Sequence, residues 1–277
     1  MSSDQARMNT TSVLRKSLIG EPLNTQFYLF STRSKPDGNV TKLQPLFAYH
    51  EALTASSGYF GDLLSEEETP NDPNWFEFQD QHHEKFALRA TISAEQMPRT
   101  PSIKDSNTQE MQHGTIPGRR VLVTDTAFKT WQVLLYYLYT DEITFAPLRS
   151  QASPTTKNSS LNEPPLCSPK SMYRLACKIK HDGLQIKALA AIRSSLTEHN
   201  VLQELSSSLT SRFPAILEME VEILFQHITT PTVTKDFPIL IRRIVGASST
   251  DFPHGAEILT KLHEKMSSQL PRGRRKT

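Results

Sequence analysis

The stretch Phe47-Ala-Tyr-His-Glu-Ala-Leu-Thr-Ala-Ser-Ser-Gly-Tyr-Phe-Gly-Asp-Leu-Leu64 decides the fold of this chain. It predicts the end of a strand, then a helix from Ala48 to Leu53, then a second short helix from Tyr59 to Leu64. None of its residues belongs to a motif with reaction chemistry. The stretch therefore indicates a binding or structural role.

A second stretch, Phe128 to Thr140, predicts a strongly amphipathic helix. Apolar side chains recur at i, i+3, i+6, i+7 and i+10, which places them on one helical face. This face consists of Phe128, Trp131, Leu134, Leu135 and Leu138. Its sides carry Tyr136, Tyr137 and Tyr139. We expect Asp125 to cap this helix, because its carboxylate can accept the free N–H groups of the first turn.

The two stretches together resemble the BTB/POZ family, which is a protein-interaction module. The match is carried by His50, Leu53, Ser57, Tyr59, Phe60, Leu64 and the helix end Leu138-Tyr139-Thr140. The resemblance implies an α+β fold, in which a small mixed sheet is flanked by a helical cluster and followed by C-terminal helices. It also implies that His50 has a structural role, in capping and orienting the central helix.

The chain is expected to have three parts. Residues 1–22 predict a flexible leader with a short apolar cluster, which by resemblance is a candidate dimerisation element. Residues 23–197 predict the BTB/POZ domain, with disordered inserts at about 91–118 and 149–166 because these segments are polar and lack periodicity. Residues 198–277 predict a helical extension that ends in a disordered basic tail. The resemblance is to fungal-type members of the family, which carry such inserts and extensions.

Strands are expected in the first half of the domain and helices in the second. Phe27 to Thr32 and Val40 to Phe47 predict a hairpin, because the turn between them contains Pro and Gly, and Trp75 to Phe78 and Arg120 to Val123 predict short strands. Ser168-Pro169 predicts a helix start, and Gly183 is expected to break that helix before Leu184 to Leu196. Further helices are expected around Val201 to Leu209, Leu217 to Ile228, Ile239 to Val245 and Glu257 to Met266.

Composition excludes several classes of protein. The net charge of +2 gives no overall field that would attract nucleic acid, so no specific nucleic-acid binding is expected. Two cysteines, Cys167 and Cys177, are too few for a disulfide framework. No apolar run is long enough to span a membrane, and the start of the sequence lacks an apolar signal region. We therefore expect a protein of the cytoplasm, the nucleus or both.

The sequence contains no familiar enzyme motif, so we expect no catalytic residue, no cofactor and no metal. His82-His83-Glu84 is the nearest approach to a metal cluster. Adjacent residues point in different directions, which makes a solvated loop the preferred interpretation.

Two kinds of partner follow from the resemblance. The first is a second copy of the chain, bound through the BTB core. The second is a cullin, since BTB adaptors of ubiquitin ligases often carry a hydrophobic-x-Glu triplet here, and Leu64-Ser65-Glu66 supplies one. On this hypothesis Leu64 fills a pocket and Glu66 meets its polar rim.

Two departures from the family pattern count against corepressor binding. The segment Asn24 to Phe27 lacks the usual Asp, and Glu51 stands where a basic residue is usual. A nuclear scaffold or transcriptional regulator without a ligase role stays open as an alternative, and an enzyme without a recognisable motif as a remote one. The substrate or partner protein is not identified by the sequence.

Overall fold

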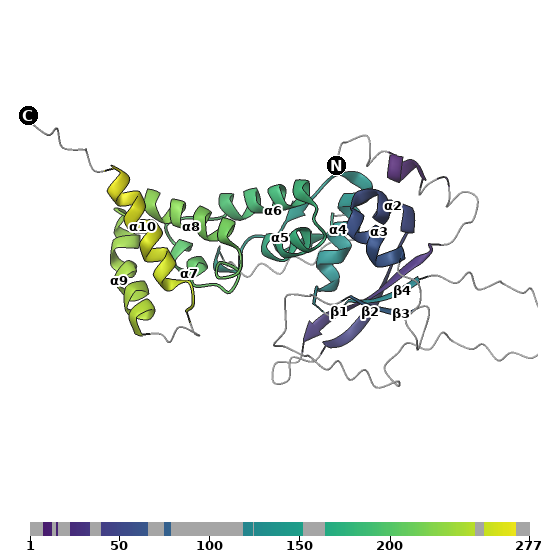
Figure 1. Ribbon diagram of the computed structural model, residues 1–277, viewed down its shortest axis with the longest axis horizontal. Helices are drawn as coiled ribbons and strands as arrows, with labels where there is room; N and C mark the ends of the chain where they lie inside the picture. The colour runs from purple at the N-terminus through teal and green to yellow at the C-terminus, as the bar shows by residue number, and fades with distance from the viewer. Residues whose placement is uncertain are drawn as a thin grey trace, which may run out of the picture. The chain divides into compact units, whose positions relative to one another are not determined.

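The computed structural model describes residues 8–12, 15, 23–33, 40–65, 75–78, 119–123, 125–151, 164–246 and 252–269 (Figure 1). The chain divides into two compact units. The first, here called the sheet unit, consists of Met1–Thr144, Ser159–Cys167 and Arg174–Gly183. The second, here called the helical unit, consists of Phe145–Asn158, Ser168–Tyr173 and Leu184–Thr277.

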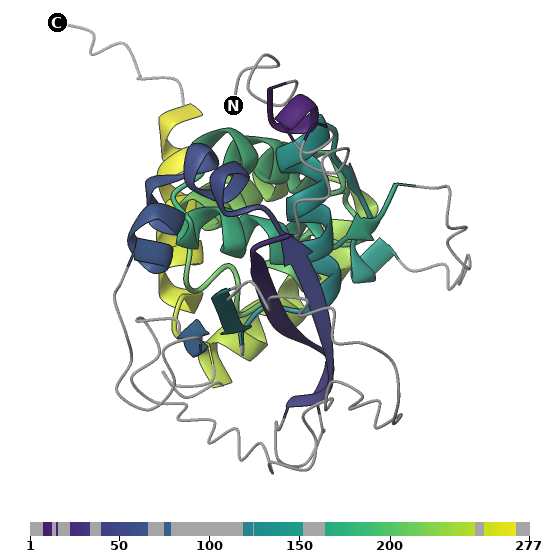
Figure 2. The same cartoon turned by 90° about the vertical axis from the view of Figure 1, so that its right-hand side faces the viewer.

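The sheet unit contains a four-stranded mixed sheet in the order β2-β1-β4-β3. Its strands are β1 (Thr25–Arg33), β2 (Val40–Ala48), β3 (Trp75–Phe78) and β4 (Arg119–Val123). β1 pairs with β2 antiparallel, whereas β4 is parallel to both β1 and β3. The expected hairpin, visible in Figure 2 as the long ribbon pair, and the short edge strand at Trp75 are thereby confirmed. The mixture of sheet and helices is an α+β architecture.

Helices α2 (His50–Ser56), α3 (Gly58–Ser65) and α4 (Phe128–Thr140) belong to the same unit. In Figure 1 they lie on one side of the sheet. Its core is built on aromatic rings: Trp131 lies 4.5 Å from the ring of Phe27 and 5.9 Å from that of Phe60. All three side chains have no exposed surface. Ring pairs at these separations stabilise a core beyond the area they bury.

One expectation about α4 is wrong and another is confirmed. Asp125 does not cap the helix: the N-cap is Ala127, without a side-chain bond from the described residues, and Asp125 pairs with Lys178 at 2.7 Å instead. The expected apolar face is confirmed, because Trp131, Leu134, Leu135 and Leu138 are buried. Burial extends beyond this face: Tyr137 is 1% exposed, and Thr130 and Val133 are also buried, so α4 is covered on more than one side.

The predicted start of α5 (Pro169–Lys178) is confirmed, but the predicted break at Gly183 is wrong. α5 ends before Lys180, whose φ of 53° is left-handed, and the N–H of His181 reaches back to the carbonyl of Ala176 at 2.9 Å. This is a Schellman-type helix end with Lys where Gly is usual. Gly183 instead lies in the first turn of α6 (Asp182–Ser194).

The described part of the helical unit consists mainly of helices. After α6 come α7 (Val201–Leu205), α8 (Pro214–Gln226), α9 (Pro231–Gly246) and α10 (Gly255–Gln269). α7 is shorter than expected, because Leu209 lies in the turns that follow it. α9 is longer than expected and contains Pro238.

Parts of the predicted second insert are ordered. Residues Arg149–Gln151 form a short 3-10 helix, η2, after the buried Leu148, and β6 (Leu166–Cys167) pairs with β5 (Thr144–Phe145). The expected disorder of 149–166 is therefore wrong at both ends, because polar composition did not reveal these anchored residues. The predicted insert 91–118 and the basic tail beyond residue 269 lie outside the described residues.

Candidate functional site

The residues that carry the family resemblance form one connected region of the sheet unit. Leu53, Phe60, Leu64 and Leu138 have no exposed surface, whereas His50, Tyr59 and Tyr139 are partly exposed. Since the apolar members of this set lie in the core, they act through packing. They position the surface around them rather than forming it.

His50 is the first residue of α2. Its backbone N–H donates a 2.7 Å hydrogen bond to Oδ1 of Asn24, just before β1. Asn24 thus satisfies one of the N–H groups that every helix leaves without an internal partner. This amide lies in the segment where the family usually has Asp. An uncharged oxygen is sufficient for the capping bond.

Ser57 joins the turn between α2 and α3 to a distant segment. Its hydroxyl donates to the carbonyl of Ile179, just beyond the end of α5, and accepts from the N–H of Tyr59 at 3.2 Å. The first bond supplies a donor to a carbonyl that has left the helical ladder. A motif residue therefore fixes the position of α3 relative to the end of α5.

Tyr139 links the two motif stretches directly. The N–H of Tyr49 donates to the phenol oxygen of Tyr139 at 3.2 Å, although 90 residues separate them in sequence. Burial raises the pKa of Tyr139, and the bond from Tyr49 opposes part of that rise. The phenol therefore stays neutral at physiological pH and serves as an acceptor at the start of α2.

The first described residues are anchored to the second motif. Residues 8–12 are helical, and Asn9 is 6% exposed. The amide of Asn9 donates to the carbonyl of Leu138 at 3.0 Å, and the hydroxyl of Thr10 donates to the carbonyl of Tyr139. These carbonyls belong to the last turn of α4, which has no helical donors for them. The expected flexible leader is thus docked at residues 8–12, because its side chains cap α4.

The expected role of Leu64 is wrong for this structure. Leu64 has no exposed surface, so its side chain cannot enter a pocket on a cullin while α3 keeps this packing. It points into the core because it follows Phe60 by one helical turn. Glu66, the other predicted contact, lies outside the described residues, as do His82-His83-Glu84.

Exposed apolar side chains lie on the segments that meet around these motifs. Met8 is 66% exposed, Phe47 is 48% exposed and Leu23 is 41% exposed. Met8 precedes the anchoring Asn9, and Phe47 and Leu23 lie within three residues of the bonded pair His50 and Asn24. These three residues are here called the apolar rim. They are the large hydrophobic residues of this region that are classed as exposed among the described residues.

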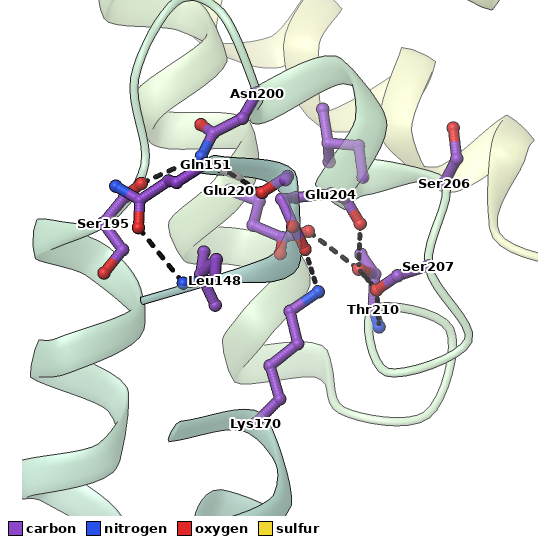
Figure 3. A network of polar contacts seen from close by, with 12 residues as sticks. Leu148, Gln151, Lys170, Ser195, Asn200, Glu204, Ser206, Ser207, Thr210 and Glu220 are labelled. Carbon is purple, nitrogen blue, oxygen red and sulfur yellow. Dashed lines mark hydrogen bonds and ion pairs between the residues drawn. The ribbon is translucent and has the colours of Figure 1, made fainter. Parts of the chain in front are cut away.

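A second candidate site is a polar network inside the helical unit (Figure 3). The ammonium of Lys170, on α5, forms an ion pair with the carboxylate of Glu204, on α7. In the turn after α7, the hydroxyl of Thr210 lies 2.9 Å from the carbonyl of Glu204 and 2.8 Å from Oε2 of Glu220, on α8. Glu220 has no exposed surface.

Asn200 organises the neighbouring turn of the same network (Figure 3). Its Oδ1 accepts from the N–H of Thr197 at 2.7 Å, and its amide donates to the carbonyl of Ser195 at 2.9 Å and to Ser150 at 3.2 Å. Because the side chain is only 1% exposed, these three protein bonds take the place of bonds to water. Asn200 thus connects the α6–α7 turn to η2.

The described residues offer little for metal or thiol chemistry. They contain no group of three or more His, Cys, Asp or Glu that could hold a metal ion. Cys167 is a buried free thiol, and burial raises its pKa to about 12, so it is not a nucleophile at neutral pH. Among the same residues, no helix is both long enough and apolar enough to cross a membrane.

No protein-family model matches this chain, and no match was found among the curated proteins.

The sequence located the motif helices but missed most of the polar groups around them. The bonds of Asn9, Thr10 and Asn24 to helix ends were not predicted. The local signal at each of these positions was the residue type, because short polar residues often cap helices. The Glu220 network carried no local signal, because its members come from three helices and a turn.

Proposed function

We propose that this chain is a non-catalytic protein-interaction module of the BTB/POZ type that associates with a second copy of itself. One observation carries the proposal: the two motif stretches, far apart in sequence, meet at the bond between Tyr49 and Tyr139. The mixed sheet with α2, α3 and α4 on one side is compatible with that assignment. Because the apolar motif residues are buried, they support the fold of such a module rather than any chemistry.

The apolar rim supports self-association. Met8, Leu23 and Phe47 expose apolar surface beside segments that are themselves held firmly by hydrogen bonds. Apolar groups on an ordered frame favour association, since little conformational entropy is lost when they are covered. The segment at residues 8–12 is docked on α4, which places Met8 on this frame.

The molar mass in solution tests self-association. Light scattering at tens of micromolar is expected to give twice the mass of the chain. Met8→Glu combined with Phe47→Glu should shift the protein to the monomer, because two charges would be placed in the apolar contact. Ile186→Glu is the matched control: Ile186 is 66% exposed on α6, away from the motif residues in sequence, and its change should leave the mass unaltered. A monomeric wild type would contradict the proposal.

A narrower form of the proposal makes the chain a substrate adaptor for a cullin-type ubiquitin ligase. It is supported by the family resemblance and by the helices α7 and α8 that follow the BTB-like part. Since Leu64 is buried, the contact must use other residues than the predicted Leu64 side chain. Mixing the protein with a cullin N-terminal domain should then give a complex of two chains with two cullins. A dimer that ignores the cullin would favour the alternative of a nuclear scaffold or regulator.

A further inference from the structure

The hydroxyl of Thr210 has more acceptors than it can serve. It has one proton, yet the carbonyl of Glu204 lies at 2.9 Å and Oε2 of Glu220 at 2.8 Å. A carbonyl oxygen never donates, and an ionised carboxylate is also an acceptor only. If Glu220 were ionised, one of the two short contacts would therefore join two lone pairs without a proton between them.

A protonated Glu220 removes this conflict. Its acid O–H would donate to Thr210, whose own proton would go to the carbonyl of Glu204. Ser207, whose hydroxyl lies 3.0 Å from that of Thr210, could donate to the remaining lone pair. Every contact of the hydroxyl then has one donor and one acceptor. The observed distances therefore fit a protonated Glu220 and not an ionised one.

The charges lead to the same conclusion. Among the described residues, Lys170 of α5 forms an ion pair with Glu204, and its charge also acts on Glu220. The remaining oxygen of Glu220, Oε1, has no hydrogen-bond partner among the described residues. Lys261 and Lys265 of α10 pair instead with Glu218 and Glu222 on the exposed side of α8. An ionised Glu220 would be a buried charge with incomplete compensation.

We infer that Glu220 donates its own proton to Thr210 in the native helical unit, and that loss of this proton makes the junction between α7 and α8 sensitive to pH. The inference concerns a proton-binding site inside the helical unit. It does not rest on the proposed function of the sheet unit.

The direction of the effect follows from linkage. Burial raises the pKa of Glu220 to about 7, with the bond from Thr210 and the charge of Lys170 opposing that rise. A carboxyl whose pKa is higher in the folded state than its ordinary 4.5 favours folding below pH 4.5. That contribution decreases as pH rises and is lost above about pH 7. Between pH 5 and pH 8 the folding equilibrium constant should fall about 70-fold because of this group.

Glu220→Gln tests the inference, because the amide can donate to Thr210 but cannot ionise. Urea unfolding at pH 5 and pH 8 should show the 70-fold loss in the wild type and not in this variant. Glu222→Gln is the matched control on the exposed side of the same helix. Since pairing with Lys265 lowers the pKa of Glu222, its change should leave the pH 5 to pH 8 interval unaffected. An equal pH dependence in the wild type and Glu220→Gln would overturn the inference.

A direct titration of the wild type keeps the test decisive if Glu220→Gln does not fold. The carboxyl carbon of Glu220, observed by NMR, should titrate near pH 7, and the amide signals of Ser207 and Thr210 should follow the same curve. A midpoint near the ordinary 4.5 would refute the inference. Neither result depends on the oligomeric state, so failure here is distinguishable from failure of the proposed self-association.

Discussion

The sheet unit and the helical unit bury polar groups in different ways. In the sheet unit, the uncharged side chains of Asn9, Asn24 and Ser57 bond backbone groups at helix ends, beside a core of aromatic rings. In the helical unit, two carboxyl groups, those of Glu204 and Glu220, are buried near each other, and one lysine, Lys170, pairs with Glu204. Neutral caps have no proton to lose, whereas buried acids do. The contribution of these neutral caps should therefore not depend on pH, whereas the contribution of the buried acids should.

The largest expected effect lies in the ring cluster of the sheet unit. Trp131→Ala should lower the free energy of unfolding by about 3–5 kcal/mol, because it leaves a cavity between Phe27 and Phe60. Urea unfolding measures the loss. It should be the same at pH 5 and pH 8, since none of these three rings ionises. Gln132→Ala, at the neighbouring exposed position of α4, should change stability by less than about 0.5 kcal/mol.

A smaller loss of stability is expected at Asn200, a buried neutral side chain of the helical unit. Asn200→Ala should cost about 1–3 kcal/mol, because the N–H of Thr197 and the carbonyl of Ser195 would both lose a buried partner. His199→Ala is the control one residue earlier, where the side chain is 71% exposed. If Asn200→Ala also changed the pH dependence of unfolding, this would contradict the claim that only ionisable groups of this unit give its stability a pH dependence.

The smallest effect should come from the charges on the surface of the helical unit. Lys265 contacts Glu222 at 2.7 Å and Glu218 at 3.2 Å, but all three are substantially exposed to solvent. A double-mutant cycle with Lys265→Ala and Glu222→Ala should give a coupling of about 0.2–1 kcal/mol that weakens with added salt. A larger, salt-independent coupling would show that exposed and buried charges contribute alike in this unit.

The sequence predicted elements with a local pattern and failed where distant residues decide. The hairpin followed from the turn residues between its strands, and the start of α5 followed from Ser168-Pro169. Asp125 looked like a cap by position alone, but Lys178 holds it in an ion pair. Gly183 looked like a breaker, but the turn is made by Lys180. Leu64 looked available for a partner because spacing cannot show which side of a short helix is covered.

Much of the polar structure was invisible for the same reason. The polar groups of the network around Thr210 come from α5, α7, α8 and the turn after α7, and no spacing rule connects them. The docking of residues 8–12 depends on the free carbonyl groups in the last turn of α4. Every helix has such carbonyl groups, and the sequence does not show which side chains will bond them. Side chains that complete a distant helix end leave only their residue type as a signal. Asn and Thr are common in polar segments of every kind, so residue type alone did not distinguish the docked ones.

The bond between Asn9 and Leu138 also constrains the order in which the chain can fold during synthesis. The two residues are separated by 129 positions. At about 5–20 residues per second, the ribosome needs roughly 6–26 s to make the segment between them. During that interval Met8 and Asn9 have no helix end to dock on. Residues 8–12 therefore cannot reach their native place until the end of α4 has been made.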